Sequence, residues 1–390
     1  MKIAFWISLF IIFYTFIGYG LLLFLLVRIK RFIKGRNDVV GEDDFTPTVT
    51  LLIAAYNEES YIAKKVKNCF ELNYPSNKLQ IVFVTDGSTD ATPEKIKQFS
   101  NVKLLHKPER RGKMAAIKRV MPLVESEIVV FTDANTFLNP DAIKKLVWHY
   151  QKPKVGAVAG EKKILVEKLA DASSAGEGFY WKYESALKKW DYELYSNVGA
   201  AGELFSIRRE LYQPVETDTI IDDHMIAMRI AEKGYIIAYE PEAFALEAAS
   251  ANAGEELKRK IRIAAGGIQS ILRLKKSANL FINPLFTFQY ISHRVLRWAI
   301  TPFLLVAVFI LNGLIVLTQP SLVYQVLFGA QVLFYLLSFA GYIFERQNIK
   351  FKAFFIPYYF CLMNYAAIAG LFRYLRRSQS AAWEKSKRKV

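Results

Sequence analysis

The chain combines four long uncharged stretches with a central block of alternating apolar and amphipathic runs. The uncharged stretches are Ile3 to Val27, Ala299 to Thr318, Leu322 to Phe344 and Ala353 to Leu371. Each has about the 17–25 residues that a helix needs to cross a hydrocarbon core of about 30 Å. A buried core helix could explain one such stretch, but not four. The pattern predicts one N-terminal and about three C-terminal transmembrane helices.

The central block has the pattern of an α/β protein. Short runs rich in β-branched residues are followed by amphipathic stretches that begin near Glu58, Thr92, Lys113 and Pro140. Strands that alternate with helices predict a mostly parallel sheet flanked by helices. The predicted strands are Val49 to Ala55, Leu79 to Val84, Val102 to Leu105, Glu127 to Thr132 and Val155 to Ala159.

One segment between the central block and the second uncharged stretch is amphipathic. Phe281 to Trp298 mixes aromatic and aliphatic side chains with His293, Arg294 and Arg297. We expect it to lie in the membrane interface, with its cations towards the lipid headgroups. The resulting domain organisation is an anchor with a basic flank (1–36), a cytoplasmic α/β domain (37–280), an interfacial segment (281–298), C-terminal transmembrane helices (299–372) and a basic tail (373–390).

The charge distribution supports a membrane protein and argues against nucleic-acid binding. The formal net charge is +16, and 53% of the residues are hydrophobic. Asn37 to Leu272 carries 31 Lys and Arg against 34 Asp and Glu, whereas the rest of the chain carries 21 against 2. A nucleic-acid-binding protein would carry the basic excess on its folded domain. Here the excess borders the uncharged stretches, and we expect no nucleic-acid partner.

The basic flanks predict the orientation but leave one conflict. Arg28, Lys30 and Arg31 follow the first stretch and should hold that end, and with it the α/β domain, in the cytoplasm. Counting four spans then places the basic tail outside, which the positive-inside rule opposes. The fourth stretch, interrupted by Pro357 and Asn364, is the one that we suspect of being re-entrant or interfacial. The two cysteines indicate a reducing compartment and no disulfide framework.

Polar and acidic residues follow three of the predicted strands. These turns are Tyr56-Asn57-Glu58-Glu59, Asp86-Gly87-Ser88-Thr89-Asp90 and Asp133-Ala134-Asn135. Ligands of such sheets bind beyond the carboxyl ends of the strands, where these turns should meet. Each of these turns alone could be explained by Gly, Asp, Asn and Ser residues that stabilise a strand-to-helix turn. Likewise, Asp222-Asp223-His224 could be explained by an N-cap at the start of a helix. Four acidic sites in this order predict a functional site.

This set of motifs resembles the membrane-bound family 2 glycosyltransferases, which include cellulose, chitin and hyaluronan synthases and ceramide glucosyltransferase. The matching stretches run from about Val49 to about Gly267, and the arrangement of spans extends the resemblance over nearly the whole chain. The resemblance implies a GT-A fold, a nucleotide-diphosphate sugar donor, and Mg²⁺ or Mn²⁺ as cofactor. The implied enzyme is a metal-dependent glycosyltransferase of the hexosyltransferase type.

The resemblance also assigns roles to individual residues. It gives Asp223 the role of general base, with Asp222 beside it and Arg262 near the diphosphate. Asp133 and Asn135 stand at the family's DxD metal motif. The acceptor side would be lined by Gly199, Ala200, Gly202 and Glu203. The donor-binding residues would be Ala55, Tyr56, Asn57, Glu58, Asp86, Gly112, Lys113 and Asp133.

Elementary chemistry agrees with these residue types, although two positions depart from the family pattern. A metal at Asp133 and the cation of Lys113 would stabilise the leaving diphosphate. Asn135 replaces the second acid of DxD. The family's QxxRW motif reads Arg259-Lys260-Ile261-Arg262-Ile263, so the Trp that packs on the acceptor sugar in processive members is missing.

The sequence therefore predicts an inverting glycosyltransferase in a membrane, with the bacterial inner membrane as the expected location. The acceptor is a membrane-associated glycan, as in cell-surface polysaccharide synthesis, or alternatively a lipid that receives a single sugar. A nucleotide-sensing transporter and an inactive scaffold are remoter alternatives, because the spans contain no charge and Asp223 is present. The sequence leaves the donor sugar and the oligomeric state open.

Overall fold

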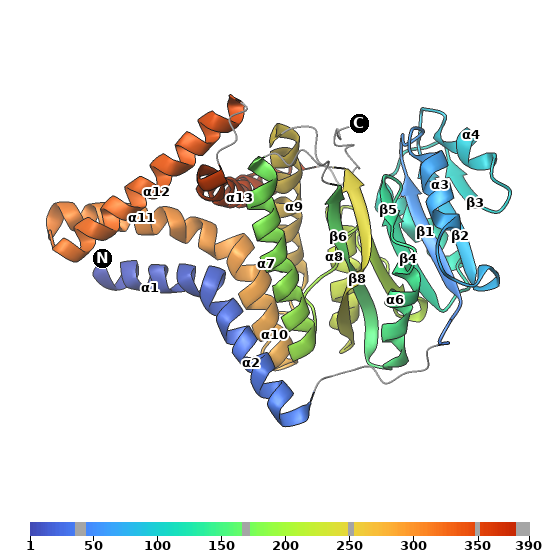
Figure 1. The fold of residues 1–390 in the computed structure, drawn as a ribbon, viewed down its shortest axis with the longest axis horizontal. Coiled ribbons are helices and arrows are strands. Elements are labelled where there is room, and N and C mark those ends of the chain that lie inside the picture. Colours follow the sequence, from blue (N-terminus) through green and yellow to red (C-terminus); the bar gives the residue numbers. More distant parts are fainter. Residues whose placement is uncertain (36–43, 166–171, 249–252, 348–351, 380–390) are drawn as a thin grey trace.

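The computed structural model describes residues 1–35, 44–165, 172–248, 253–347 and 352–379. Its centre is a sheet in the order β3-β2-β1-β4-β7-β6-β8-β5 (Figure 1). β1 to β4 are mutually parallel, β7 runs antiparallel to β4 and β6, and β5 runs antiparallel to β8. The strands are β1 (Val49–Ala55), β2 (Leu79–Asp86), β3 (Lys103–Lys107), β4 (Ile128–Asp133), β5 (Thr136–Leu138), β6 (Val155–Leu165), β7 (Leu204–Arg208) and β8 (Ile236–Ala248).

The central strand β1 shows why its apolar run forms a strand buried on both faces. All seven of its residues are buried. Leu52 and Ala54 point into one apolar cluster, whereas Leu51 and Ile53 point into another on the opposite face. Side chains alternate across a strand, so a parallel strand covered by helices on both sides needs a continuous apolar run. The predicted mostly parallel sheet flanked by helices is confirmed.

Helices cover both faces of the sheet and form the membrane region. The helices of the α/β domain are α3 (Ile62–Phe70), α4 (Thr92–Lys97), α5 (Lys113–Val120), α6 (Ala142–Trp148), α7 (Ala172–Leu194), α8 (Asp222–Ala231) and α9 (Ala253–Arg273). The others are α1 (Lys2–Phe13), α2 (Tyr19–Lys34), α10 (Pro284–Tyr290), α11 (Thr301–Thr318), α12 (Leu322–Arg346) and α13 (Lys352–Leu375). Short π-helical segments, η1 (Tyr14–Gly18) and η6 (Ile291–Ile300), join α1 to α2 and α10 to α11.

Four helical stretches within the described residues are long and apolar enough to cross a membrane: Lys2–Lys34, Pro284–Thr318, Leu322–Arg346 and Ala353–Leu375. In Figure 1, α1, α11 and α12 extend to one side of the molecule, and the sheet lies on the other. Helices α7 and α9 stand between the two parts, and α13 packs against both of them. The α/β domain is therefore connected to the candidate membrane helices through a layer of helices formed by α7, α9 and α13.

The segment from 281 to 298 is helical from Pro284 and continues through η6 into α11. Phe281 is 99% exposed, as expected for an interfacial aromatic residue. The cations, however, turn inward instead of facing headgroups. His293 is fully buried, and Arg294 and Arg297 both bind the Glu184 carboxylate on α7. Of the predicted basic tail, residues 380–390 lie outside the described part of the chain.

Candidate active site

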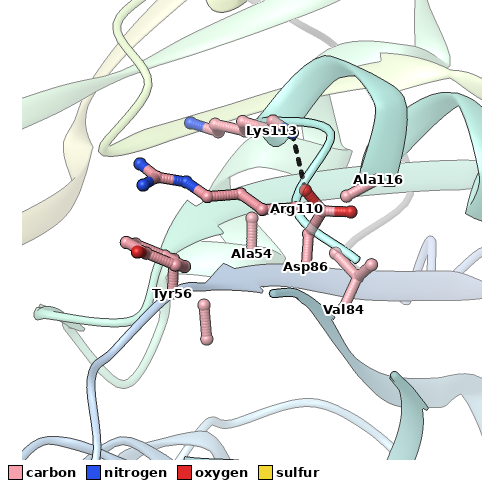
Figure 2. A pocket seen from close by; sticks show the side chains of 9 residues that line it. Ala54, Tyr56, Val84, Asp86, Arg110, Lys113 and Ala116 are labelled. Carbon is pink, nitrogen blue, oxygen red and sulfur yellow. Dashed lines mark hydrogen bonds between the residues drawn. The ribbon is translucent and has the colours of Figure 1, made fainter. Parts of the chain in front are cut away.

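The carboxyl ends of β1 and β2 and the start of α5 enclose a small pocket. Its lining comes from the last residues of the two strands, from Tyr56 directly after β1, and from the loop and first turn of α5 (Figure 2). Parallel strands end at one edge of the sheet, so turns that are distant in sequence meet there. The lining residues are Ala54, Ala55, Tyr56, Val84, Asp86, Arg110, Gly112, Lys113 and Ala116.

Asp86 holds the loop that leads into α5. Its Oδ2 accepts hydrogen bonds from the backbone N–H groups of Arg111 and Gly112, each at 2.6 Å. Gly112 has φ +93°, a left-handed conformation that glycine adopts without strain. Gly87 leaves no room for a side chain, since a Cβ there would lie 2.5 Å from Cβ of Arg110. The Asp86 turn thereby sets the position of the Arg110–Lys113 loop.

Tyr56 and Arg110 form one wall of the pocket. The Arg110 guanidinium lies over the Tyr56 ring, 4.1 Å from its centre (Figure 2). Such a stacked pair offers a planar surface of the kind on which a nucleobase packs. Asn57, at φ 54°, does not point into this pocket but joins the turns after β1 and β2: its Oδ1 accepts from the Thr89 N–H at 2.8 Å. Glu58 is buried beside the same turn, and its N–H donates to the Thr92 hydroxyl.

Lys113 lies at the centre of three carboxylates. Its Nζ is 3.1 Å from Asp133 Oδ1 and 3.5 Å from Asp222 Oδ2. A Cβ on Gly202 would lie 3.4 Å from Asp223 Oδ2 and 3.6 Å from Lys113 Nζ, which brings the third carboxylate to the same place. Burial alone would lower the pKa of Lys113, but Asp133, Asp222 and Asp223 together raise it. Lys113 is therefore a permanent cation between the donor pocket and Asp223.

Asp223 is a carboxylate that lies beside a second one, Asp222. Asp222 and Asp223 begin α8, as residues of its first turn. Burial, reinforced by the negative charge of Asp222, raises the pKa of Asp223 to about 7. A base is most effective when its pKa lies near the working pH. The N-cap of α8 is Ile221, with no side-chain cap hydrogen bond, so the N-cap interpretation of Asp223 is wrong. Acidic residues in the first turn nevertheless suit the positive end of the helix dipole.

The predicted acceptor-side residues lie next to this centre but differ in their surroundings. Gly202 contacts Asp223, and Gly199 packs against the ring of His224. Ala200 packs at the edge of the apolar core. Glu203 forms buried ion pairs with Lys162 at 2.6 Å and Arg259 at 3.7 Å. Burial alone would raise the pKa of Glu203, but these two cations hold it well below the usual range.

Arg262 does not reach the three carboxylates directly. Its Nη1 donates to the backbone carbonyl of Ile220, two residues before Asp222, at 3.3 Å. Arg262 therefore lies behind the Asp222–Asp223 turn. Arg259, at the position of the family's Gln, is tied to Glu203 and Glu256.

A buried lysine supports the loop that carries Asp133. Lys65 on α3 is completely buried, and its Nζ donates to the Thr136 carbonyl at 2.7 Å and to the Thr132 hydroxyl at 3.2 Å. The same Thr132 hydroxyl donates to the Glu203 carbonyl at 2.9 Å. Burial lowers the pKa of Lys65 to about 8. Sequence reasoning missed Lys65, because Lys64, Lys65 and Lys67 all resemble a solvent-exposed charged run.

The predicted metal would be held by oxygen atoms at the Asp133 loop. Within the described residues, no group of three or more His, Cys, Asp and Glu side chains is arranged to hold a metal ion. Asn135 directly follows Ala134 in the same loop as Asp133, and its side chain is half-buried. Three carboxylates around the single ammonium of Lys113 nevertheless leave excess negative charge. Carboxylate and amide oxygens fit Mg²⁺ or Mn²⁺ when phosphate oxygens complete the ligand set.

The comparisons with known proteins agree with this geometry. Residues 50–215 match the family model Glycosyl transferase family 2. A beta-monoglucosyldiacylglycerol synthase from Nostoc sp. is 32% identical over 200 residues, which cover 47% of this chain and 41% of that protein. A poly-beta-1,6-N-acetyl-D-glucosamine synthase from Staphylococcus aureus is 27% identical over 264 residues, which cover 65% of this chain and 62% of that protein. The matched region thus spans less than two thirds of these relatives.

A solved structure shows the same fold over nearly the whole chain. A mannosyltransferase from Pyrobaculum calidifontis, determined in complex with GDP-Man and Mn²⁺, superposes with a TM-score of 0.74 at 24% identity. The superposition covers 96% of this chain and 100% of that one. The predicted GT-A-like fold, with one N-terminal and three C-terminal stretches long and apolar enough to span a membrane, is therefore confirmed.

Proposed function

We propose that this chain, in which residues 50–215 form a family 2 glycosyltransferase domain, transfers a sugar from a nucleotide-diphosphate donor to a membrane-associated acceptor with inversion. One observation carries the proposal: Lys113 lies between the Asp133 loop at the donor pocket and the Asp222–Asp223 pair. Cationic and basic groups thus meet where the glycosidic bond would break and form. The homologous glucosyltransferase and N-acetylglucosamine polymerase support the same chemistry.

The residues divide into a leaving-group side and an attacking side. The nucleoside would bind between the Tyr56–Arg110 stack and Asp86, which places its diphosphate near Lys113. As the bond to the sugar breaks, negative charge grows on the diphosphate, and the fixed ammonium of Lys113 stabilises it without reorganisation. Asp223 takes the proton of the acceptor hydroxyl as that oxygen attacks the anomeric carbon. A single displacement inverts that carbon.

A divalent cation fits the donor side. Asp133, with Asn135 beside it, would hold Mg²⁺ or Mn²⁺ together with the diphosphate, and the cation supplies Lewis-acid stabilisation of the leaving group. The excess of three carboxylates over one ammonium supports this assignment. The mannosyltransferase with the same fold was determined with Mn²⁺ and GDP-Man, which supports a divalent cation and a nucleotide sugar here.

The acceptor is a membrane-associated glycan or lipid, and the active domain faces the cytoplasm. The basic residues after the first span, Arg28, Lys30 and Arg31, support this orientation. Polysaccharide synthesis is supported by the similarity to the poly-beta-1,6-N-acetyl-D-glucosamine synthase. Transfer of one sugar to a lipid is the second candidate, because Ile263 stands where processive members have Trp, and a further relative makes a glucosyl lipid.

The test is release of nucleoside diphosphate from a panel of nucleotide sugars with Mg²⁺ or Mn²⁺, followed by mass spectrometry of the products. Asp223→Asn should lower the rate of transfer about 10²–10⁴-fold, because it removes the base. Donor binding by the variant should stay within about threefold of wild type, since Asp223 lies on the attacking side. Full turnover by Asp223→Asn would refute its role as base, and a wild-type protein inert towards every donor would refute the enzyme.

A further inference from the structure

His224 stands next to the proposed base and has an unsatisfied ring nitrogen. It is 4% exposed, and its Nε2 has no hydrogen-bond partner among the described residues. Leaving a buried polar atom without a partner costs about 1–3 kcal/mol. A buried polar atom without a hydrogen-bond partner is rare in folded proteins, and one explanation is that a bound ligand supplies the missing partner. His224 and Asp223 both border the Gly199–Gly202 loop, so the ligand that we consider is the acceptor.

The same glycine-flanked loop borders Asp223 and His224. Gly199 has φ +136°, and any Cβ at this position would collide with His224 Nδ1. Gly202, at the other end of the loop, lies beside Asp223, because a Cβ there would be 3.4 Å from Asp223 Oδ2. The two ends of the loop therefore border the imidazole and the base. Burial and the nearby Arg294 lower the pKa of His224 to about 3, so the ring is neutral and carries one donor and one acceptor.

Residues of the membrane region border the other side of the imidazole. The Trp298 ring on η6 meets the His224 ring edge to face, with centres 5.4 Å apart. Trp298 is only half-buried, and it packs against the apolar cluster of Ile220, Ile221 and Ala265. Tyr374 of α13 joins the same cluster. The polar site at Asp223 thus adjoins an apolar wall made by the segment that enters a span and by the last membrane helix.

We propose that His224 and Trp298 form the acceptor subsite, with His224 hydrogen-bonding the polar end of a lipid alcohol and Trp298 packing on its apolar body. This inference rests on the proposed function and narrows its acceptor to a lipid. A neutral ring suits an uncharged hydroxyl-bearing head. The apolar surface formed by Trp298, Ile221 and Tyr374 suits the hydrocarbon part of the lipid next to that head. A free oligosaccharide would leave that wall exposed to water.

The test measures transfer to diacylglycerol in phosphatidylcholine vesicles, with the nucleotide sugar that the wild-type enzyme turns over. His224→Phe keeps an aromatic ring but removes both nitrogens, and should raise the KM for diacylglycerol roughly 3–10-fold. The KM for the donor should not change. His224→Gln restores a donor and an acceptor and should recover part of the loss, which a purely structural role would not predict. Trp298→Ala should raise the same KM, and Trp298→Phe should raise it less.

Three outcomes would overturn the inference. One is an unchanged diacylglycerol KM in a His224→Phe variant that binds donor normally. Another is a wild-type enzyme that turns over the donor but transfers no sugar to diacylglycerol, including one that uses N-acetylglucosamine oligomers instead. The third is a loss in His224→Phe that affects donor and acceptor equally. A wild-type enzyme that turns over no nucleotide sugar refutes the proposed function itself, so the two failures are distinguishable.

Discussion

At the scale of single residues, the arrangement of charge around Asp223 determines how activity should depend on pH. Burial and Asp222 both disfavour the charged form of Asp223 and raise its pKa to about 7. Because a base must be deprotonated to act, kcat/KM should rise with pH through about 7 and then level off.

Asp222→Asn removes the neighbouring negative charge, so it should move this rise to lower pH by about one unit. The measurement is the pH profile of kcat/KM for wild type and variant under saturating metal. A rise at the same pH in Asp222→Asn would show that another group controls the profile.

Lys65 allows a second prediction at this scale. Lys65→Met keeps the length of the side chain but leaves the Thr136 carbonyl without its buried donor, so it should destabilise the protein by about 1–3 kcal/mol. The loop of Asp133 should also lose its support, and more Mg²⁺ or Mn²⁺ should be needed for half-maximal activity. Thermal unfolding and metal titrations measure the two effects.

Lys64→Met is the matched control, because Lys64 is exposed on the same helix. It should change neither stability nor metal requirement appreciably. Equal behaviour of the two variants would mean that Lys65 does not support the Asp133 loop.

At the scale of elements, a buried charge cluster joins α7 to the helix that enters the membrane. Glu184 accepts from Arg294 at 3.1 Å and from Arg297 at 2.8 Å, and it is 3.1 Å from His293 Nε2. His293 Nδ1 faces Asp191, which also accepts from the Tyr19 hydroxyl on α2. Burial alone would raise the pKa of Glu184, but His293 and the two arginines hold it well below its usual range. These contacts connect the catalytic domain to two separate membrane segments.

Removing this one carboxylate charge should therefore have a large effect. Glu184→Gln removes the buried negative charge that Arg294 and Arg297 bind and should destabilise the protein by about 3–5 kcal/mol. Glu242→Gln breaks the surface pair with Lys145, in which the Glu242 side chain is 68% exposed, and should cost about 0–1 kcal/mol. Unfolding of the detergent-solubilised variants distinguishes the two cases, and similar losses would contradict the importance of the buried cluster.

At the scale of the whole molecule, the packing of α13 indicates on which side of the membrane the basic tail lies. Although α13 is long and apolar enough to span a membrane, it packs against α7 and α9 of the α/β domain. A Cβ at Gly370 would lie 2.6 Å from the Cβ of Ala264 on α9, so the C-terminal part of α13 touches the catalytic domain. In Figure 1, α13 is viewed nearly end-on, whereas α11 and α12 extend across the page. This arrangement favours an interfacial α13 over a fourth crossing.

The prediction is that Ser378 lies on the same side of the membrane as the catalytic domain. Ser378→Cys in a Cys69→Ser, Cys361→Ser background should react with a membrane-impermeant maleimide in inverted vesicles but not in intact cells. Ser321→Cys, in the turn between α11 and α12, should show the opposite pattern. Labelling of Ser378→Cys from outside intact cells would establish a true fourth span.

The sequence alone determined the elements whose patterns are local. The apolar run of β1 predicted a doubly covered strand, and the motifs at Asp86, Asp133 and Asp223 predicted a family 2 glycosyltransferase, whose family model matches residues 50–215. β5, β7 and β8 were not predicted, because their pairing is antiparallel or distant and depends on partners far along the chain.

Only the tertiary structure decided which charges are solvated and which are paired. In the sequence, Lys65 and Arg294 cannot be distinguished from cations on the protein surface. In the structure, Lys65 supports the Asp133 loop and Arg294 binds Glu184. Charge is a property of the residue, whereas burial and pairing depend on elements brought together by folding. For the same reason His224 could be noticed in the sequence, but its place between Gly199 and Trp298 became visible only when the membrane segment packed against the catalytic domain.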